Sequence, residues 1–339
     1  MAETKIAFFE TEKWEEDYLR EKLATVKNIS LDFSPTILEP NNLAKARNAG
    51  ILAVFIYSKI QKEILDALPG LKSIATMSTG FDHIDIKECQ SRKIKVSNVP
   101  TYGSNTVAEH TFALILALSR KLVPSIERTR QGDFTLEGLR GFDLSGKTIG
   151  IIGLGNIGKH VARIASGFEM NILAFDPMPD KSFGRKMKIK FMEVDELLAN
   201  SDIITLHAPD NEKTHHLINK NNIEKIKKGA CLVNTARGGL VETEALLSAL
   251  KQDILAGAGL DVLEEECVVK EEKELLAAPF QNKCDLKTVL QNHILIQNPK
   301  VIVTPHNAFN SKEALARILD TTIENILAFL KNKPINLVK

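Results

Sequence analysis

The chain has 339 residues, which favours two domains, because a single hydrophobic core rarely grows past about 250 to 300 residues. Apolar residues make up 44% and charged residues 26%, a balance typical of a folded globular protein rather than of a disordered or fibrous one. Lys and Arg number 44 and Asp and Glu 43, so a formal charge of +1 gives no overall field that would attract nucleic acid or an anionic membrane. No basic segment followed by an apolar stretch opens the chain, and no run of about 18 apolar residues occurs, so we expect a cytoplasmic protein.

Short runs rich in Ile, Val and Leu alternate with longer segments of helical period, a pattern that predicts an α/β fold with mostly parallel sheets. The N-terminal part has predicted strands at 5–9, 51–56, 73–76 and 95–97, followed by a long apolar helix at 106–119. Six further strands recur at crossover spacing, at 148–152, 171–175, 203–206, 230–234, 257–260 and 300–303. They suit a doubly wound nucleotide-binding sheet. An amphipathic helix predicted at 311–330 could return to the first domain and make it discontinuous.

The segment TIGIIGLGNIGKHVARIA places Gly153, Gly155 and Gly158 in GxGxxG spacing, directly after an apolar strand and directly before a helix. In a dinucleotide-binding fold these glycines permit a tight turn, let the backbone approach the pyrophosphate, and let the helix pack on the strand. The helix N-terminus would face the negative charge, so residues 154–158 are expected to contact phosphate.

Asp176 distinguishes this motif from an ordinary glycine-rich turn. It ends the next predicted strand, about 20 residues beyond the glycines, where a carboxylate can bind the adenosine ribose hydroxyls and repel a 2′-phosphate. The sequence therefore predicts NAD as the cofactor rather than NADP.

Three polar segments follow later strands: NTARGG at 234–239, GLDVLEEE at 259–266 and TPHNAF at 304–309. Ligands of open α/β sheets bind at the carboxyl ends of the strands, so these segments are expected to meet at one site. They supply Arg237, Glu266 and His306. A 2-keto acid needs a cation for its carboxylate, a proton donor for the developing alkoxide, and an acid that keeps the donor protonated near neutrality. Alone, Arg237 would suit a surface ion pair and His306 a core or capping role, but together they favour this chemistry.

The same segments resemble the D-isomer-specific 2-hydroxyacid dehydrogenase family, from MSTGFDHID at 77–85 through TPHNAF. The resemblance implies that Arg237 orients the substrate, that His306 is the general acid or base, and that Glu266 is the carboxylate partner of His306. Of the three consecutive glutamates, only Glu266 has the family's spacing from Asp261. No metal is expected to take part.

The resemblance further implies a Rossmann-type NAD-binding domain at 103–305 and a smaller flavodoxin-like substrate domain formed by 1–102 and 306–339. It assigns the backbone N–H groups of Thr79 and Gly80 to the substrate carboxylate; the alternative is that these residues form only a turn. His207 would line the cofactor or be a structural histidine, and Asp261 would approach the nicotinamide or anchor either Arg237 or the loop. The complete set of expected cofactor contacts is Gly153, Leu154, Gly155, Asn156, Ile157, Gly158, Asp176, His207, Ala208, Pro209, Thr235, Ala236 and Asp261.

Two aromatic residues bear on the substrate. Tyr102 matches a tyrosine of the D-lactate dehydrogenase branch and could give the carboxylate another hydrogen bond, while Phe309 could crowd the far side and favour a short or apolar tail. The long segment between Glu266 and His306 also looks like that branch. The sequence therefore favours pyruvate and D-lactate as substrates.

Other interpretations stay open at this point. Larger 2-keto acids or 3-phosphoglycerate could be the substrate, because an apolar pocket discriminates one methylene by only about 1 to 3 kcal/mol. A non-catalytic NAD-sensing corepressor is a rival from another class. The family is usually homodimeric, and the helix at 106–119 could contribute to a dimer or be buried within one chain. The four cysteines are widely spaced, without a metal-ligand pattern, and Cys231 is expected to be a buried small hydrophobe.

Overall fold

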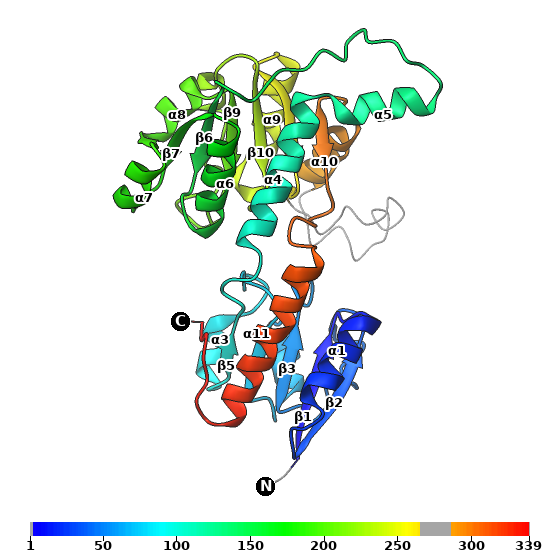
Figure 1. Cartoon of the computed structure of the whole chain (residues 1–339). Helices are drawn as coiled ribbons and strands as arrows, with labels where there is room; N and C mark the ends of the chain where they lie inside the picture. Colours follow the sequence, from blue (N-terminus) through cyan, green and yellow to red (C-terminus); the bar gives the residue numbers. More distant parts are fainter. Residues whose placement is uncertain (1–2, 265–285, 339) are drawn as a thin grey trace. The chain divides into compact units, whose positions relative to one another are not determined.

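The computed structural model describes residues 3–264 and 286–338 (Figure 1). The chain divides into two compact units, one formed by Met1–Tyr102 with Ser311–Lys339 and the other by Gly103–Asn310. The return to the first unit comes slightly later than the expected residue 306, because Asn307 and Ala308 donate backbone hydrogen bonds to Asp261 of the second unit. Among the described residues, no helix is both long and apolar enough to cross a bilayer.

The first unit contains a five-stranded parallel sheet in the order β2-β1-β3-β4-β5, which is the flavodoxin-like order. Its strands are β1 (Thr4–Phe9), β2 (Ile29–Ser34), β3 (Ile51–Val54), β4 (Ser73–Thr76) and β5 (Lys95–Ser97). The helices α1 (Lys13–Leu23), α2 (Lys62–Ala67) and α3 (Ile86–Ser91) connect them. Every residue of β3 and β4 is buried, as expected for central parallel strands covered on both faces.

The last helix, α11 (Lys312–Leu330), belongs to this first unit and packs against α1 and β4. Ser311 caps it by accepting a hydrogen bond from the backbone N–H of Ala314 at 3.2 Å. From α11, Asn325 Nδ2 donates to the carbonyl oxygen of Asn98 at 2.8 Å, and Tyr18 donates to Asp320 at 2.7 Å. The C-terminal helix therefore completes the N-terminal sheet, so the first unit is discontinuous in sequence.

The second unit contains a seven-stranded parallel sheet in the order β12-β11-β10-β9-β6-β7-β8. Its strands are β6 (Thr148–Ile152), β7 (Asn171–Phe175), β8 (Lys190–Phe191), β9 (Ile203–Leu206), β10 (Ala230–Asn234), β11 (Leu255–Leu260) and β12 (Val301–Val303). The strand order reverses between β6 and β9. The carboxyl ends of these two strands therefore form the switch point at which doubly wound sheets bind nucleotides.

Helices cover both faces of this second sheet (Figure 1). One hydrophobic cluster joins one face to α4 (Ser104–Ser119) and α6 (Asn156–Gly167), through residues such as Phe112 and Val161. The other cluster joins the opposite face to α8 (Val194–Asn200), α9 (Thr243–Lys251) and α10 (Leu286–Gln297). The described elements also include α5 (Leu122–Arg130), α7 (Lys181–Lys186) and the short 3-10 turns η1 (Ile223–Lys225) and η2 (Gly238–Leu240).

The predicted fold class is confirmed: both units are parallel α/β sheets flanked by helices. The sequence analysis missed two strands, β2 and β8, and each lies at an edge of its sheet. Cys231 is a free, buried residue of β10, as predicted, and burial raises the pKa of its thiol to about 11.

Candidate active site

The predicted site residues of the second unit follow six strands that end in register. The last residues of these strands pair across the sheet in the order Phe175, Ile152, Leu206, Asn234, Leu260 and Val303. The segments directly after them carry Asp176, Gly153, His207, Arg237, Asp261 and His306, respectively. One edge of one sheet therefore gathers the cofactor motif and the residues of the candidate chemistry.

The glycine turn after β6 has the shape that a bound dinucleotide requires. Gly153 has φ +93°, and a Cβ there would lie 2.7 Å from the backbone carbonyl of His207. A Cβ on Gly158 would lie 2.1 Å from the carbonyl oxygen of Gly153, so only glycine lets α6 pack this closely on the turn. Gly155 instead faces open space, with no atom within 4 Å of a Cβ built there. A phosphate could approach the backbone at this position.

Two polar features complete this cradle. The helix α6 begins after Gly155 without a side-chain cap, so the backbone N–H groups of its first turn, at Asn156 and Ile157, can meet an anion. Asp176 accepts hydrogen bonds from the backbone N–H groups of Leu154 and Met178, both at 2.8 Å. Its carboxylate therefore sits beside the glycine turn, where ribose hydroxyls are expected.

His207 follows β9, ahead of Ala208 and Pro209, and has polar atoms that the described part of the protein does not pair. Both of its ring nitrogens are buried and have no hydrogen-bond partner among the described residues. Burial lowers the pKa of His207 to about 3, so the ring is neutral. A structural histidine would normally be hydrogen-bonded inside the protein. The orphaned ring, the open Gly155 and the uncapped α6 together fit a dinucleotide.

The loop after β10 presents Arg237 and is held by Asn234, which the sequence analysis did not single out. Asn234 Nδ2 donates to the carbonyl oxygen of Arg237 at 2.8 Å, and its Oδ1 accepts from the N–H of Ala236 at 3.0 Å. Thr235 contacts Thr111 of α4 through a hydroxyl hydrogen bond of 2.9 Å. These contacts fix the backbone on both sides of the guanidinium-bearing residue.

Asp261 holds the loop that carries His306. Its side chain is only 1% exposed, and it accepts hydrogen bonds from the backbone N–H groups of Asn307 at 3.0 Å and Ala308 at 2.9 Å. The N–H of His306 donates to the backbone carbonyl of Asp261 at 2.9 Å, and His306 itself has φ +51°. Asp261 therefore anchors the loop that carries His306.

Glu266 lies outside the described residues. The nearby Glu264 is engaged elsewhere: its carboxylate lies 2.6 Å from His216 Nε2 and accepts from the Thr243 hydroxyl at 2.7 Å. With His215 these groups place three potential metal-ligand atoms within 4.8 Å of one another. The His215 and His216 rings are stacked, with centroids 4.1 Å apart, so their in-plane lone pairs do not converge on one point. We interpret Glu264 and His216 as a structural pair between loops.

The substrate residues expected in the first unit lie on a well-held loop after β4. The Thr79 hydroxyl donates to the carbonyl oxygen of Val99 at 2.7 Å, and Asn98 Nδ2 donates to the carbonyl oxygen of Thr79 at 2.8 Å. The Ser78 hydroxyl donates to the carbonyl oxygen of Gly80 at 2.6 Å. These side chains and carbonyls are thus used within the loop and hold it in place. Tyr102 ends the first unit and Phe309, half-buried, lies near the end of the second.

Comparison with known proteins decides the family. The NAD-binding domain of the D-isomer-specific 2-hydroxyacid dehydrogenases matches residues 112–308. A 2-hydroxyacid dehydrogenase homolog of Haemophilus influenzae is 36% identical over 334 residues, which cover 97% of each chain. The chain belongs to the D-isomer-specific 2-hydroxyacid dehydrogenase family.

Solved structures of this dehydrogenase family extend the similarity to both units. The structure of the pyruvate reductase of Chlamydomonas reinhardtii matches with a TM-score of 0.87 at 35% identity, covering 98% of each chain. D-lactate dehydrogenase from Aquifex aeolicus, complexed with NAD and lactic acid, matches with a TM-score of 0.83 at 34% identity, over 97% of this chain and 96% of that one. The chain is thus a 2-hydroxyacid dehydrogenase, an oxidoreductase that uses NAD.

Proposed function

We propose that this dehydrogenase reduces pyruvate to D-lactate with NADH, with Arg237, His306 and Glu266 as its catalytic residues. The observation that supports the proposal is that the site residues follow the carboxyl ends of strands in the second sheet. There the Arg237 loop follows β10 and the His306 loop follows β12, on the same row of strand ends as the glycine turn. Cation, proton donor and cofactor motif are thus supplied by one rigid element.

Bound NADH supplies the hydride that is added to C2 of the keto acid. The guanidinium of Arg237 holds the substrate carboxylate and polarises the carbonyl oxygen. As the carbon–oxygen double bond opens, His306 gives a proton to that oxygen, and the product is the 2-hydroxy acid. Glu266 is the proposed carboxylate partner of His306, so a Glu266→Gln variant should lose reduction activity.

We propose a small substrate, because residues of this protein would contact both its carboxylate and its tail. The backbone N–H groups of Thr79 and Gly80, with the Tyr102 hydroxyl, would bind the carboxylate, and Phe309 would limit the tail. The names of two solved relatives, a pyruvate reductase and a D-lactate dehydrogenase bound to lactic acid, support the same choice.

A panel of keto acids tests this substrate choice. Pyruvate, 2-ketoisocaproate, phenylpyruvate and 3-phosphohydroxypyruvate would each be incubated with enzyme and NADH, with NADH absorbance as the readout. We expect the highest kcat/KM for pyruvate. A higher value for a longer keto acid would overturn the substrate while leaving the chemistry intact. NADH binding without turnover of any keto acid would favour the sensing role instead.

We also propose a cytoplasmic homodimer. The helix α4 is largely buried within its own unit, so it is a core element rather than a free face. The next helix, α5, has no buried residue, and it exposes Leu122, Val123 and Ile126 by 44%, 38% and 49%. Such an apolar side on an extended helix suits contact with a second copy. The free thiols of Cys89 and Cys231 suit a reducing compartment.

A further inference from the structure

The loop that carries His306 depends on one buried carboxylate, that of Asp261. Asp261 accepts the Asn307 N–H on Oδ1 and the Ala308 N–H on Oδ2, so both oxygens point at the residues just after His306. Thr304, just before His306, also donates its hydroxyl to Asp261 Oδ1 at 2.5 Å. His306 is thereby held between two anchored neighbours in a left-handed conformation, with φ +51°, that a non-glycine residue rarely adopts.

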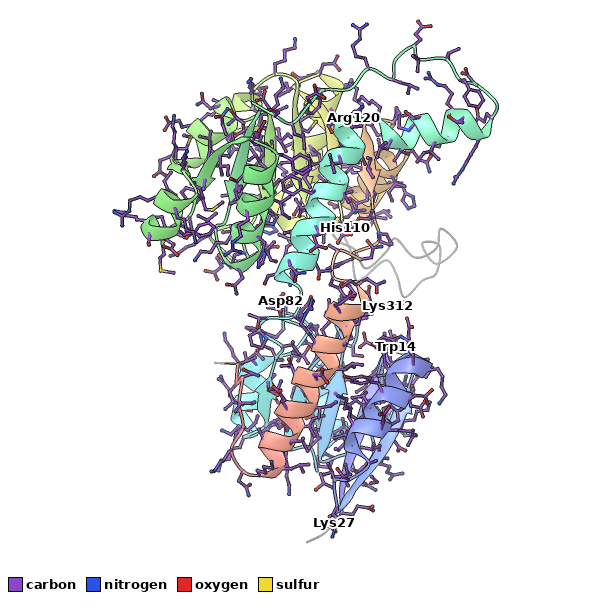
Figure 2. The ribbon with its side chains drawn as sticks, viewed as in Figure 1. Trp14, Lys27, Asp82, His110, Arg120 and Lys312 are labelled. Carbon is purple, nitrogen blue, oxygen red and sulfur yellow. The ribbon has the colours of Figure 1, made fainter. Side chains whose placement is uncertain are left out.

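A second histidine completes this arrangement from another element. His110 lies on α4 (Figure 2), and its Nε2 is 3.1 Å from the Thr304 hydroxyl and 3.4 Å from Asp261 Oδ1. The Thr304 hydroxyl has a single proton, which goes to the Asp261 carboxylate, so the same hydroxyl oxygen must accept from His110. The nitrogen of His110 that faces Thr304 therefore carries a proton.

The result is a series of hydrogen bonds, each donated in the same direction, from α4 to the His306 loop. His110 donates to Thr304, Thr304 donates to Asp261, and Asp261 receives the backbone N–H groups beyond His306. Burial by itself would raise the pKa of Asp261, but the hydrogen bonds from His110, Thr304 and the two backbone groups together lower it. A carboxylate kept ionised in this way can hold all of its donors at once.

We infer that His110 is a positioning residue for the reaction: through Thr304 and Asp261 it holds the backbone of His306 in the conformation used for proton transfer. This inference rests on the role proposed above for His306. The distances and the direction of the donors distinguish it from a simple packing role, because packing would not require a proton on Nε2. His110 touches neither substrate nor cofactor in this account.

The test compares variants that break or keep the donor. In His110→Leu, we expect kcat for pyruvate reduction to fall roughly tenfold or more, because small displacements of a proton donor are costly. The KM values for NADH and pyruvate should stay within about twofold, since binding groups are untouched. His110→Gln should keep most of kcat, because its amide N–H can still reach Thr304. Glu109→Gln, on the exposed side of the same helix, is the matched control and should behave as wild type.

A double-mutant cycle with Thr304→Val tests whether His110 acts through Thr304. Both changes break one series of hydrogen bonds, so the His110→Leu/Thr304→Val enzyme should be no slower than the slower single variant. Additive losses, or a His110→Gln enzyme as slow as His110→Leu, would overturn the inference. So would a His110→Leu enzyme with unchanged kcat. If His110→Leu does not fold, His110→Asn, whose amide is too short to reach Thr304, takes its place.

The outcome stays separable from that of the proposed function. Near-native turnover in a His306→Gln enzyme would show that His306 is not the proton donor. The hydrogen bonds from His110 to the His306 loop would then have no catalytic role. A His306→Gln enzyme that is inactive beside a fully active His110→Leu enzyme would refute only the positioning role of His110.

Discussion

At the scale of single residues, Asp176 serves both the glycine turn and the choice of cofactor. Its carboxylate accepts two backbone N–H groups at 2.8 Å, so it shapes the turn as well as offering oxygens to a ribose. A negative charge at this point also repels a 2′-phosphate. Cofactor preference should therefore depend on the charge of this side chain more than on its size.

Asp176→Asn is expected to weaken NADH use and improve NADPH use. Loss of one charge-assisted hydrogen bond should raise KM for NADH by about tenfold, and the kcat/KM ratio of NADPH to NADH should rise. Steady-state kinetics with both cofactors measures this ratio. Asp180→Asn is the control, because Asp180 caps α7 and pairs with Lys159 at 2.7 Å outside the turn. An unchanged ratio in Asp176→Asn would refute the assignment.

The residues predicted from the sequence were those that belong to a recognisable local motif. GxGxxG, the aspartate after the next strand, and the Arg and His segments each combine a strand end with a polar residue, so their placement at the sheet edge follows from topology. Their supporting partners were not predictable in this way. His110 meets Thr304 across 194 positions and His216 meets Glu264 across 48, and only the folded chain brings such pairs together.

At the scale of elements, the burial of each strand explains whether it could be predicted from the sequence. The central strands β3, β4 and β9 are buried throughout and read as short apolar runs. The missed strand β2 is an edge strand with mostly half-exposed residues, and β8 is an edge strand of two residues. Edge strands need less apolar surface, so their sequences carry a weaker signal.

The start of α9 provides a prediction about pH. Burial would raise the pKa of Glu264, but hydrogen bonds from His216 and Thr243 outweigh it and lower the pKa from its ordinary value of 4.5. A lowered pKa means that the carboxylate stabilises the fold at pH above the unfolded value, and that this contribution is lost as pH falls through the folded value.

Glu264→Gln should therefore lower the Tm at pH 7, by an amount corresponding to about 1 to 2 kcal/mol. The difference from wild type should shrink as the pH is lowered below 4.5. Thermal unfolding followed by circular dichroism across this range measures it. Glu244→Gln removes an exposed glutamate of α9 and should change the Tm little. A constant difference at all pH values would contradict a stabilising role for the ionised Glu264 carboxylate.

At the scale of the whole molecule, the chain forms two α/β units, and its last helix completes the first sheet. The division expected from the sequence rested on two local signals, the glycine motif and the amphipathic C-terminal helix.

The proposed dimer is tested on α5. Ile126→Glu places a charge on the exposed apolar side of this helix, and burying that charge at an interface without a partner is costly. Light scattering after size-exclusion chromatography should show a dimer for wild type and a monomer for the variant. Lys181→Glu, at an exposed position on α7, should remain dimeric. A wild-type monomer, or a dimeric Ile126→Glu variant, would refute this interface.

The most direct test of the central claim is the single-turnover rate of pyruvate reduction by wild type and His306→Gln, each saturated with NADH. We expect rapid NADH oxidation by wild type and a rate at least about a hundredfold lower in the variant, because a general acid contributes at least that much. NADH affinity should be unchanged. A variant that oxidises NADH at the wild-type rate would contradict the proposed chemistry.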